Sequence, residues 1–121
     1  MAIIRINMMI KTKKALSQAG ITSMTATGHV HGRGRGYWDA QVMEGIKNNE
    51  PEALALIGGE PRLRPHTMIM VTVPESKAKL VVNTIIEVNK TGQHGDGKIF
   101  VLPENDVIRV RTGESGMGVL D

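Results

Sequence analysis

The sequence predicts one α+β domain in which a few strands pack against two helices. A length of 121 residues suits a single domain, and two helical apolar patterns alternate with β-prone runs that end at glycine or proline. Cysteine is absent, which excludes disulfides and thiol catalysis. The net charge of +3 permits an anionic ligand without demanding one. With no apolar run of about 18 residues and no signal-peptide pattern, we expect a cytoplasmic protein.

The first half of the chain reads as strand, helix and strand. Residues 2–6 form a short predicted strand, and residues 11–18 a helix in which Leu16 faces inward. Gly20 is well suited to end that helix, because glycine readily adopts the left-handed conformation found after helix ends. Residues 21–30 are β-prone because they are rich in threonine.

A long segment without strand periodicity comes next, over residues 33–65. Residues 41–47 and 52–57 could each form a helical turn, between breakers that contain proline or glycine. Loops longer than about 15 residues inside a compact domain are usually functional or disordered. We therefore expect a working loop, and its two aromatic residues, Tyr37 and Trp38, are candidate anchors for a target protein.

The second half repeats the strand–helix–strand order. Residues 68–73 form the next predicted strand, Ser76 is the expected N-cap of a helix that ends near Lys90, and residues 99–102 form a fourth strand. A short β segment over 107–111 follows. The helix has an apolar stripe made of Ala78, Val81, Val82, Ile85 and Ile86. Two such halves around a long loop predict a ferredoxin-like βαββαβ sandwich over residues 1–121.

The glycine-rich segment 91–98 is the strongest candidate site. Its glycines allow positive φ and a close approach of the backbone to a ligand, and successive N–H groups in such a loop form an anion-binding concavity. Lys98 adds a positive charge beside it. Arg109 and Arg111, two residues apart, would share one face of a strand. This combination suits a polyphosphate.

The segment has two alternative interpretations. Gly92 to Lys98 fits the G-x-x-x-x-G-K pattern of a P-loop, but Ile99 stands where Ser or Thr would hold magnesium. The expected order, from helix into strand, is also the reverse of a P-loop. The second alternative is an ordinary helix-to-strand connection with a solvated lysine.

Other residues suggest metal or nucleic-acid binding more weakly. His29 and His31 could lie on one strand face as metal ligands, with His66 or His94 as a third, but no cysteine or nearby acid completes the set. Residues 33–36 alternate arginine and glycine, as in some RNA-binding segments. With only one Phe, one Tyr and one Trp, however, the chain lacks aromatic platforms for base stacking. We expect neither a protein-held metal nor a nucleic-acid partner.

The chain resembles the PII nitrogen-regulatory proteins along nearly its whole length. Two motifs carry most of the resemblance: Thr-Gly-x-x-Gly-Asp-Gly-Lys-Ile-Phe-Val over 91–101, and Ile-Arg-x-Arg-Thr-Gly-Glu over 108–114. Ala-Ile-Ile-Arg over 2–5, Lys-Ala-Leu over 14–16 and Gly-x-Gly-Arg over 32–35 support it. The resemblance implies a trimer that is not an enzyme. It would bind ATP or ADP between subunits and 2-oxoglutarate beside ATP–Mg²⁺, and the long loop (the T-loop, 33–65) would dock on targets.

The resemblance also implies roles for individual residues. The glycine loop of one subunit would cradle the phosphates, two arginines of the C-terminal segment (105–121) would reach them from the neighbour, and the base of the T-loop would lie nearby. The implied nucleotide-binding residues are Gly32, Gly34, Arg35, Gly95, Asp96, Gly97, Lys98, Arg109 and Arg111.

Several departures from the family pattern bear on function. The tyrosine-bearing Thr-Glu-Leu-Tyr-Arg-Gly segment of the T-loop is absent, so uridylylation is not expected. Gly36 replaces a glutamine, and His66 replaces a lysine that pairs with 2-oxoglutarate, so a full charge is lost there. Arg62 or Arg64 could compensate. The resemblance thus implies a 2-oxoglutarate site with Gly36 and His66, in which these replacements remove a side-chain ligand and a positive charge.

The altered, longer loop looks most like that of the NifI subgroup. Those proteins act as paired paralogues that inhibit nitrogenase reversibly. The resemblance thus implies a homotrimer or a hetero-oligomer with a paralogue, and nitrogenase as the target. An ammonium transporter or glutamine synthetase is the alternative target, and a ferredoxin-like nucleic-acid-binding module is the remaining alternative.

Overall fold

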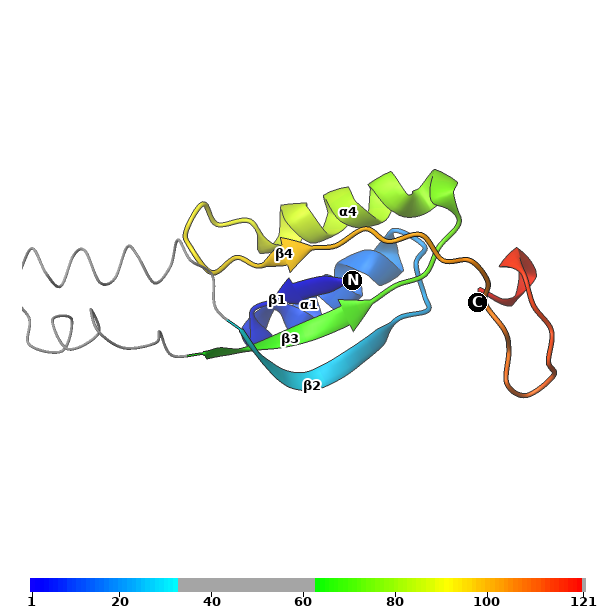
Figure 1. Ribbon diagram of the computed structural model, residues 1–121. Coiled ribbons are helices and arrows are strands. Elements are labelled where there is room, and N and C mark those ends of the chain that lie inside the picture. Colours follow the sequence, from blue (N-terminus) through cyan, green and yellow to red (C-terminus); the bar gives the residue numbers. More distant parts are fainter. Residues whose placement is uncertain (33–62, 121) are drawn as a thin grey trace, which may run out of the picture.

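A computed structural model describes residues 1–32 and 63–120 of the chain. Its strands and helices follow the βαββαβ order (Figure 1). The elements are β1 (Ala2–Ile4), the 3₁₀ turn η1 (Ile6–Met8), α1 (Met9–Gln18), β2 (Thr25–Gly32), β3 (Arg64–Met70), α4 (Glu75–Asn89), β4 (Lys98–Ile99) and the 3₁₀ turn η2 (Met117–Val119).

The described strands form one antiparallel sheet in the order β2-β3-β1-β4. Ile3 on the central strand β1 pairs with Met68 on β3 and with Lys98 on β4. The pairing of β2 with β3 is irregular between Ala26 and His29. This strand order and the two helices confirm the ferredoxin-like fold.

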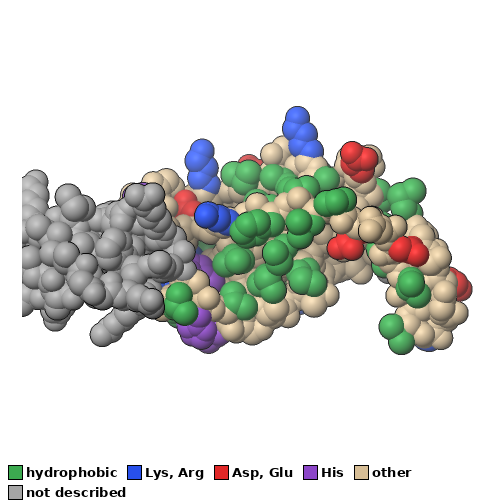
Figure 2. Space-filling view, viewed as in Figure 1, with side chains coloured by type: hydrophobic (Ala, Val, Ile, Leu, Met, Phe, Trp, Pro, Cys, Tyr) green, Lys and Arg blue, Asp and Glu red, His purple; other side chains and the backbone are tan. Residues whose placement is uncertain are grey.

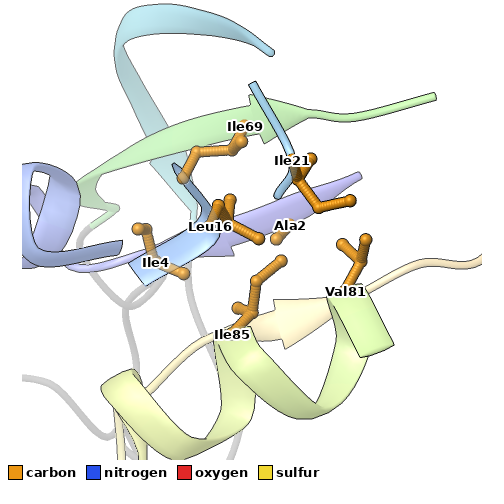
Figure 3. Packing of buried hydrophobic residues seen from close by; sticks show 7 residues of the cluster. All are labelled: Ala2, Ile4, Leu16, Ile21, Ile69, Val81 and Ile85. Atoms are coloured by element: carbon orange, nitrogen blue, oxygen red, sulfur yellow. The ribbon is translucent and has the colours of Figure 1, made fainter. Parts of the chain in front are cut away.

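The core lies between the helices and one face of the sheet (Figure 3). Alternation along β1 turns Ala2 and Ile4 towards the helices, and each is 1 % exposed. Leu16 of α1 meets them and is fully buried. The remaining buried apolar side chains are Ile21, Ile69, Val81 and Ile85. The apolar stripes predicted for both helices therefore face the sheet, except that Ile86 lies outside the core, 44 % exposed.

A buried polar contact joins the two helices at the end of α4 that leads into the glycine loop. The Asn89 side-chain amide donates to Thr12 Oγ1 at 3.0 Å and to the Ile85 carbonyl at 2.9 Å. The Thr12 hydroxyl in turn donates to the Met8 carbonyl at 2.7 Å. Because a buried polar group without partners is costly, this chain of bonds favours one arrangement of α1 against α4. It thereby sets where the glycine loop starts.

Several boundaries differ from those predicted in the first half. The first strand ends at Ile4 rather than residue 6, because the chain turns into η1 at Ile6. The helix α1 starts at Met9, two residues early. Residues 21–24 are not in the sheet, since Ile21 instead closes the end of α1 through its amide, bonded to the Leu16 carbonyl at 2.9 Å. Gly20, with φ 87°, ends α1 as predicted.

The second-half boundaries follow from where partner strands exist. β3 covers 64–70 instead of 68–73, because β2 pairs with it from Arg64 and no strand pairs beyond Met70. β4 stops at Ile99 instead of 102, since β1 begins opposite it at Ala2. Ser76 is the second residue of α4 and not its N-cap, a position that Pro74 occupies without a side-chain bond.

The strand predicted over 107–111 is wrong. Ile108 forms a single bridge with Ser115, and a tight turn lies between them. The Gly113 amide donates to the Arg109 carbonyl at 2.7 Å, and Gly113 has φ 73°. A glycine accepts this conformation at little cost, so it favours a turn where the alternation of residues suggested a strand.

Candidate functional site

Three segments meet at one end of the sheet. β2 ends at Gly32 opposite Arg64, where β3 begins, and the loop from 90 to 97 enters β4 at Lys98, beside β1. In Figure 1 the yellow glycine loop accordingly lies near the last residues of β2 and the first residues of β3. The 100–120 segment leaves β4 in the opposite direction. The glycine loop therefore sits at the base of the long loop, at the end of the sheet away from the C-terminal segment.

The glycines of the loop are required by its backbone. Gly92, Gly95 and Gly97 have φ values of 81°, 97° and 117°. A Cβ atom on Gly97 would lie 2.0 Å from the backbone oxygen of Ile3, so no side chain fits there. The loop is thus pressed against β1. The amides of His94 and Gly95 have no acceptor among the residues that the structure describes, which leaves them available to an anion.

The Asp96 carboxylate organises the loop from within. One oxygen accepts the Nη1–H of Arg5 at 2.6 Å and the Thr91 hydroxyl. The other accepts the backbone amides of Thr91 at 2.8 Å and Gly92 at 3.1 Å. The pKa of Asp96 is held far below its usual range, chiefly by the hydrogen bonds from the hydroxyl and the amide of Thr91. The Arg5 guanidinium and the Gly92 amide lower the pKa further, whereas burial raises it by less than either bond from Thr91 lowers it. Asp96 is therefore ionised at neutral pH.

Arg5, the residue that directly follows β1, reaches this loop with its side chain. Its second nitrogen, Nη2, donates to the His94 carbonyl at 3.1 Å. The side chains of Arg5 and Asp96 are 30 % and 24 % exposed, so the pair is partly sheltered from solvent. Arg5 was not singled out as a site residue from the sequence, and neither was Thr91. Only the short spacing between Thr91 and Asp96 could have indicated a loop contact, whereas Arg5 and Asp96 are 91 positions apart.

Lys98 lies on the sheet face opposite the helices. It pairs with Ile3, whose side chain points away from the core that Ala2 and Ile4 line. Lys98 is exposed and has no ion pair within residues 1–32 and 63–120. His66 precedes Met68 by two residues on β3 and so shares this face, and its Nδ1 lies 3.0 Å from the Arg64 carbonyl. Figure 2 shows basic and histidine side chains at this end of the molecule.

The rest of the open face is apolar. Figure 2 shows hydrophobic side chains gathered over the middle of the sheet. Alternation from Ile3 places on it Met1, Ile3, Met68, Met70 and Phe100, of which Met70 is 46 % and Phe100 42 % exposed. We call this set the open apolar face. The described helices, α1 and α4, cover the other side of the sheet.

The C-terminal arginines are held in a hairpin far from the glycine loop. Arg109 Nη1 contacts Glu114 Oε2 at 3.2 Å, and the Arg109 amide donates to the Glu114 carbonyl at 2.8 Å. Arg111 lies exposed in the turn. Since no strand forms here, the expectation that Arg109 and Arg111 share a strand face is wrong. In Figure 1 the hairpin that carries these arginines lies at the far end of the molecule from the glycine loop, which leads into β4 at Lys98, so one chain does not bring them together.

The remaining predicted site residues are placed as follows. Gly32 ends β2 at the base of the long loop. Gly34, Arg35, Gly36, Tyr37 and Trp38, and the helical turns expected over 41–57, lie outside the described residues. No group of three potential metal ligands occurs among the described residues, His29 and His31 included. None of the described helices combines the length and apolar character needed to cross a membrane.

Comparison with known proteins gives a consistent result. The family model described as nitrogen regulatory protein P-II matches residues 1–114. A protein of Methanobacterium ivanovii named nitrogen fixation nifHD region GlnB-like protein 2 is 48 % identical over 116 residues, covering 95 % of this chain and 92 % of that protein. A protein of Methanococcus maripaludis with the corresponding name is 44 % identical over 117 residues, covering 95 % of this chain and 93 % of that protein.

A solved structure agrees with the sequence relatives. The crystal structure of Arabidopsis thaliana PII bound to citrate superposes with a TM-score of 0.71 at 33 % identity, covering 98 % of this chain and 84 % of that one. PII proteins are regulators rather than enzymes. The names of the Methanobacterium ivanovii and Methanococcus maripaludis proteins agree with the NifI subgroup. From fold, loop motif and relatives together, the chain belongs to the P-II family of nitrogen regulatory proteins.

Proposed function

We propose that this protein is a cytoplasmic signal transducer that binds ATP or ADP at the glycine loop. Mg²⁺ would accompany ATP, and the protein would regulate nitrogenase through its T-loop (33–65). The observation that carries the nucleotide proposal is the geometry of the loop. The loop offers a site suited to phosphate oxygens. It combines glycines at positive φ with the exposed Lys98 and with the backbone amides of His94 and Gly95, which have no acceptor in the described chain. Gly32, at the end of β2, would border it.

The nucleotide site is proposed to form between copies of the chain. A triphosphate needs more than one cation, and Lys98 is separated from Arg109 and Arg111 within one chain. The open apolar face supports association, because contiguous exposed apolar surface of this kind usually marks an interface. A trimer, which is typical of PII proteins, would let the hairpin of one copy approach the loop of the next. A hetero-oligomer with a paralogue would serve the same purpose.

The proposed effector is 2-oxoglutarate. His66 lies on the same sheet face as Lys98, and a neutral imidazole can donate one hydrogen bond to a carboxylate, although it lacks the charge of a lysine. The Arabidopsis relative was solved with citrate, also a carboxylate. We therefore expect weaker 2-oxoglutarate binding than a lysine at position 66 would give. Gly36 belongs to this proposed site but lies outside the described residues.

Nitrogenase is the proposed target because the relatives are named for a nifHD region. The T-loop would dock on it through Tyr37 and Trp38, since aromatic residues often dominate binding energies. An ammonium transporter or glutamine synthetase is the alternative.

Calorimetric titration of ATP–Mg²⁺ into the protein, with and without 2-oxoglutarate, tests the nucleotide and effector proposals together. We expect binding of ATP that tightens when 2-oxoglutarate is present, because each ligand would favour the same state. If the affinity for ATP does not change with 2-oxoglutarate, the protein would be a sensor of adenine nucleotides alone, and His66 would have no part in effector binding. Absence of nucleotide binding would overturn the proposed function.

A further inference from the structure

The Asp96 carboxylate has no capacity left for a ligand. A carboxylate offers about four acceptor positions. Four donors already take them: the Arg5 guanidinium, the Thr91 hydroxyl and the amides of Thr91 and Gly92. A bound cation or a nucleotide hydroxyl could reach Asp96 only by displacing one of these bonds. The position of Asp96 inside a phosphate-type loop thus does not make it a ligand.

The Arg5 guanidinium is likewise committed to the loop. Nη1 contacts Asp96 at 2.6 Å and Nη2 contacts the His94 carbonyl at 3.1 Å. One rigid planar group therefore ties two points of the loop to the end of β1. Its charge is balanced by Asp96, which leaves the exposed Lys98 as the lysine on the open sheet face beside the loop, without an ion pair within the described residues.

Asp96 and Thr91 together supply the acceptors for the first amides of the loop. The amides of Thr91 and Gly92 point inward to Asp96, and the Gln93 amide donates to Thr91 Oγ1 at 3.1 Å. The next two amides, of His94 and Gly95, have no acceptor in the described part of the chain. Without the inward bonds, the first three amides would lack acceptors like the next two, and the loop would lose the contacts that fix this part of its backbone.

We propose that Arg5, Asp96 and Thr91 are positioning residues: they form an internal clamp that holds the glycine loop in its anion-accepting shape before any ligand binds. This inference deepens the proposed nucleotide function and rests on it for its effect on affinity. The clamp itself is a property of the free protein. Its benefit is preorganisation, because a loop that is already ordered loses less conformational entropy on binding.

The test compares Asp96→Asn and Arg5→Gln with matched controls on exposed helix positions, Glu87→Gln and Lys13→Gln. Amide hydrogen exchange of the ligand-free protein is measured at Thr91, Gly92 and Gln93, together with the core amide of Leu16. Calorimetry gives the affinity for ATP–Mg²⁺. We expect exchange of the three loop amides to rise by roughly tenfold or more in the clamp variants, from the usual contribution of charge-assisted hydrogen bonds. Leu16 should stay protected, and the controls should match the wild type.

The sign of the affinity change separates a positioning role from direct contact with phosphate. If Asp96 faced the phosphates, removing its negative charge would tighten ATP binding. A clamp predicts the reverse, a loss of about tenfold or more. Arg5→Lys refines this result: it keeps the charge but lacks the planar fork that donates to both Asp96 and the His94 carbonyl, so it should resemble Arg5→Gln. Unchanged loop exchange, tighter binding in Asp96→Asn, or full retention of affinity in Arg5→Lys would overturn the clamp.

A second pair of variants guards against a folding defect. Thr91→Val removes the hydroxyl at nearly constant shape, whereas Thr91→Ser keeps it. The clamp predicts faster exchange at Gln93 in Thr91→Val alone, and equal rates in both would contradict it. If the wild-type protein binds no nucleotide, the proposed function fails, and the exchange rates by themselves decide whether the clamp exists.

Discussion

Asp96 and Gly97 are adjacent residues that act on the loop in different ways. Asp96 gathers four donors around one carboxylate, whereas Gly97 allows the backbone to pass against the Ile3 carbonyl. The first role depends on the charge and shape of a side chain, and the second on having none. Both bring the end of the loop against β1, and Lys98, next in sequence, is thereby placed on the open side of the sheet.

Gly97→Ala should be far more destabilising than a similar change at Gly92. Gly97 combines φ 117° with a Cβ position 2.0 Å from backbone, while Gly92 has φ 81° and open space around it. We expect a loss of about 1 kcal/mol for Gly92→Ala, from the conformation alone. For Gly97→Ala we expect about 3 kcal/mol or more, since a backbone clash is added. Chemical denaturation measures both, and equal losses would mean that β1 can move away.

At the scale of elements, the helices are positioned by one apolar stripe each and by the contact of Asn89 with Thr12. The stripe of α4 is narrow. Ile85 is 4 % exposed, whereas its neighbour Ile86 is 44 % exposed. Since α4 leads directly into the glycine loop, the packing of this helix determines where the loop begins.

Ile85→Ala and Ile86→Ala form a matched pair that tests this packing. The same atoms are removed at adjacent positions, so side-chain chemistry cancels from the comparison. We expect Ile85→Ala to lower the free energy of unfolding by about 2–5 kcal/mol, as for other buried large-to-small changes. Ile86→Ala should cost about 1 kcal/mol or less. Similar losses at the two positions would show that α4 packs in a different rotation.

The elements also show which features could be predicted from the sequence. The order of strands and helices follows from local periodicity, and so does the glycine loop with Lys98. The boundaries of β3 and β4 depend on where β1 and β2 offer partners, which is non-local information. The contact between Arg5 and Asp96 spans 91 positions and leaves no local pattern. The segment 107–111 alternates like a strand but pairs with none of the strands in residues 1–32 and 63–120, and Ile108 bridges Ser115 in a hairpin instead.

At the scale of the whole molecule, the two faces of the sheet differ in what covers them. One face carries the helices, and the other leaves Met70 and Phe100 partly exposed beside Lys98. Association through the open apolar face would bury these side chains and bring a second chain close to the glycine loop. Assembly and ligand binding are therefore linked in the proposed function.

Met70→Glu should weaken assembly, and Leu80→Glu should not. The two residues have nearly equal exposure, 46 % and 45 %, but Met70 lies on the open apolar face and Leu80 on α4. Burying an unpaired carboxylate at an apolar interface costs about 5 kcal/mol. Sedimentation equilibrium should show wild-type and Leu80→Glu oligomers and smaller Met70→Glu species. Dissociation by Leu80→Glu alone would place the interface on the helical side.

Calorimetry on mixed oligomers shows whether the nucleotide site is shared between chains. One chain carries Lys98→Ala and the other carries Arg109→Gln with Arg111→Gln, and they are unfolded together and refolded as a mixture. Each variant alone should bind ATP–Mg²⁺ weakly. A shared site predicts that the mixture regains wild-type affinity at a fraction of its sites, because the intact loop of one chain meets the intact hairpin of the other. A mixture as weak as its two components would contradict the account.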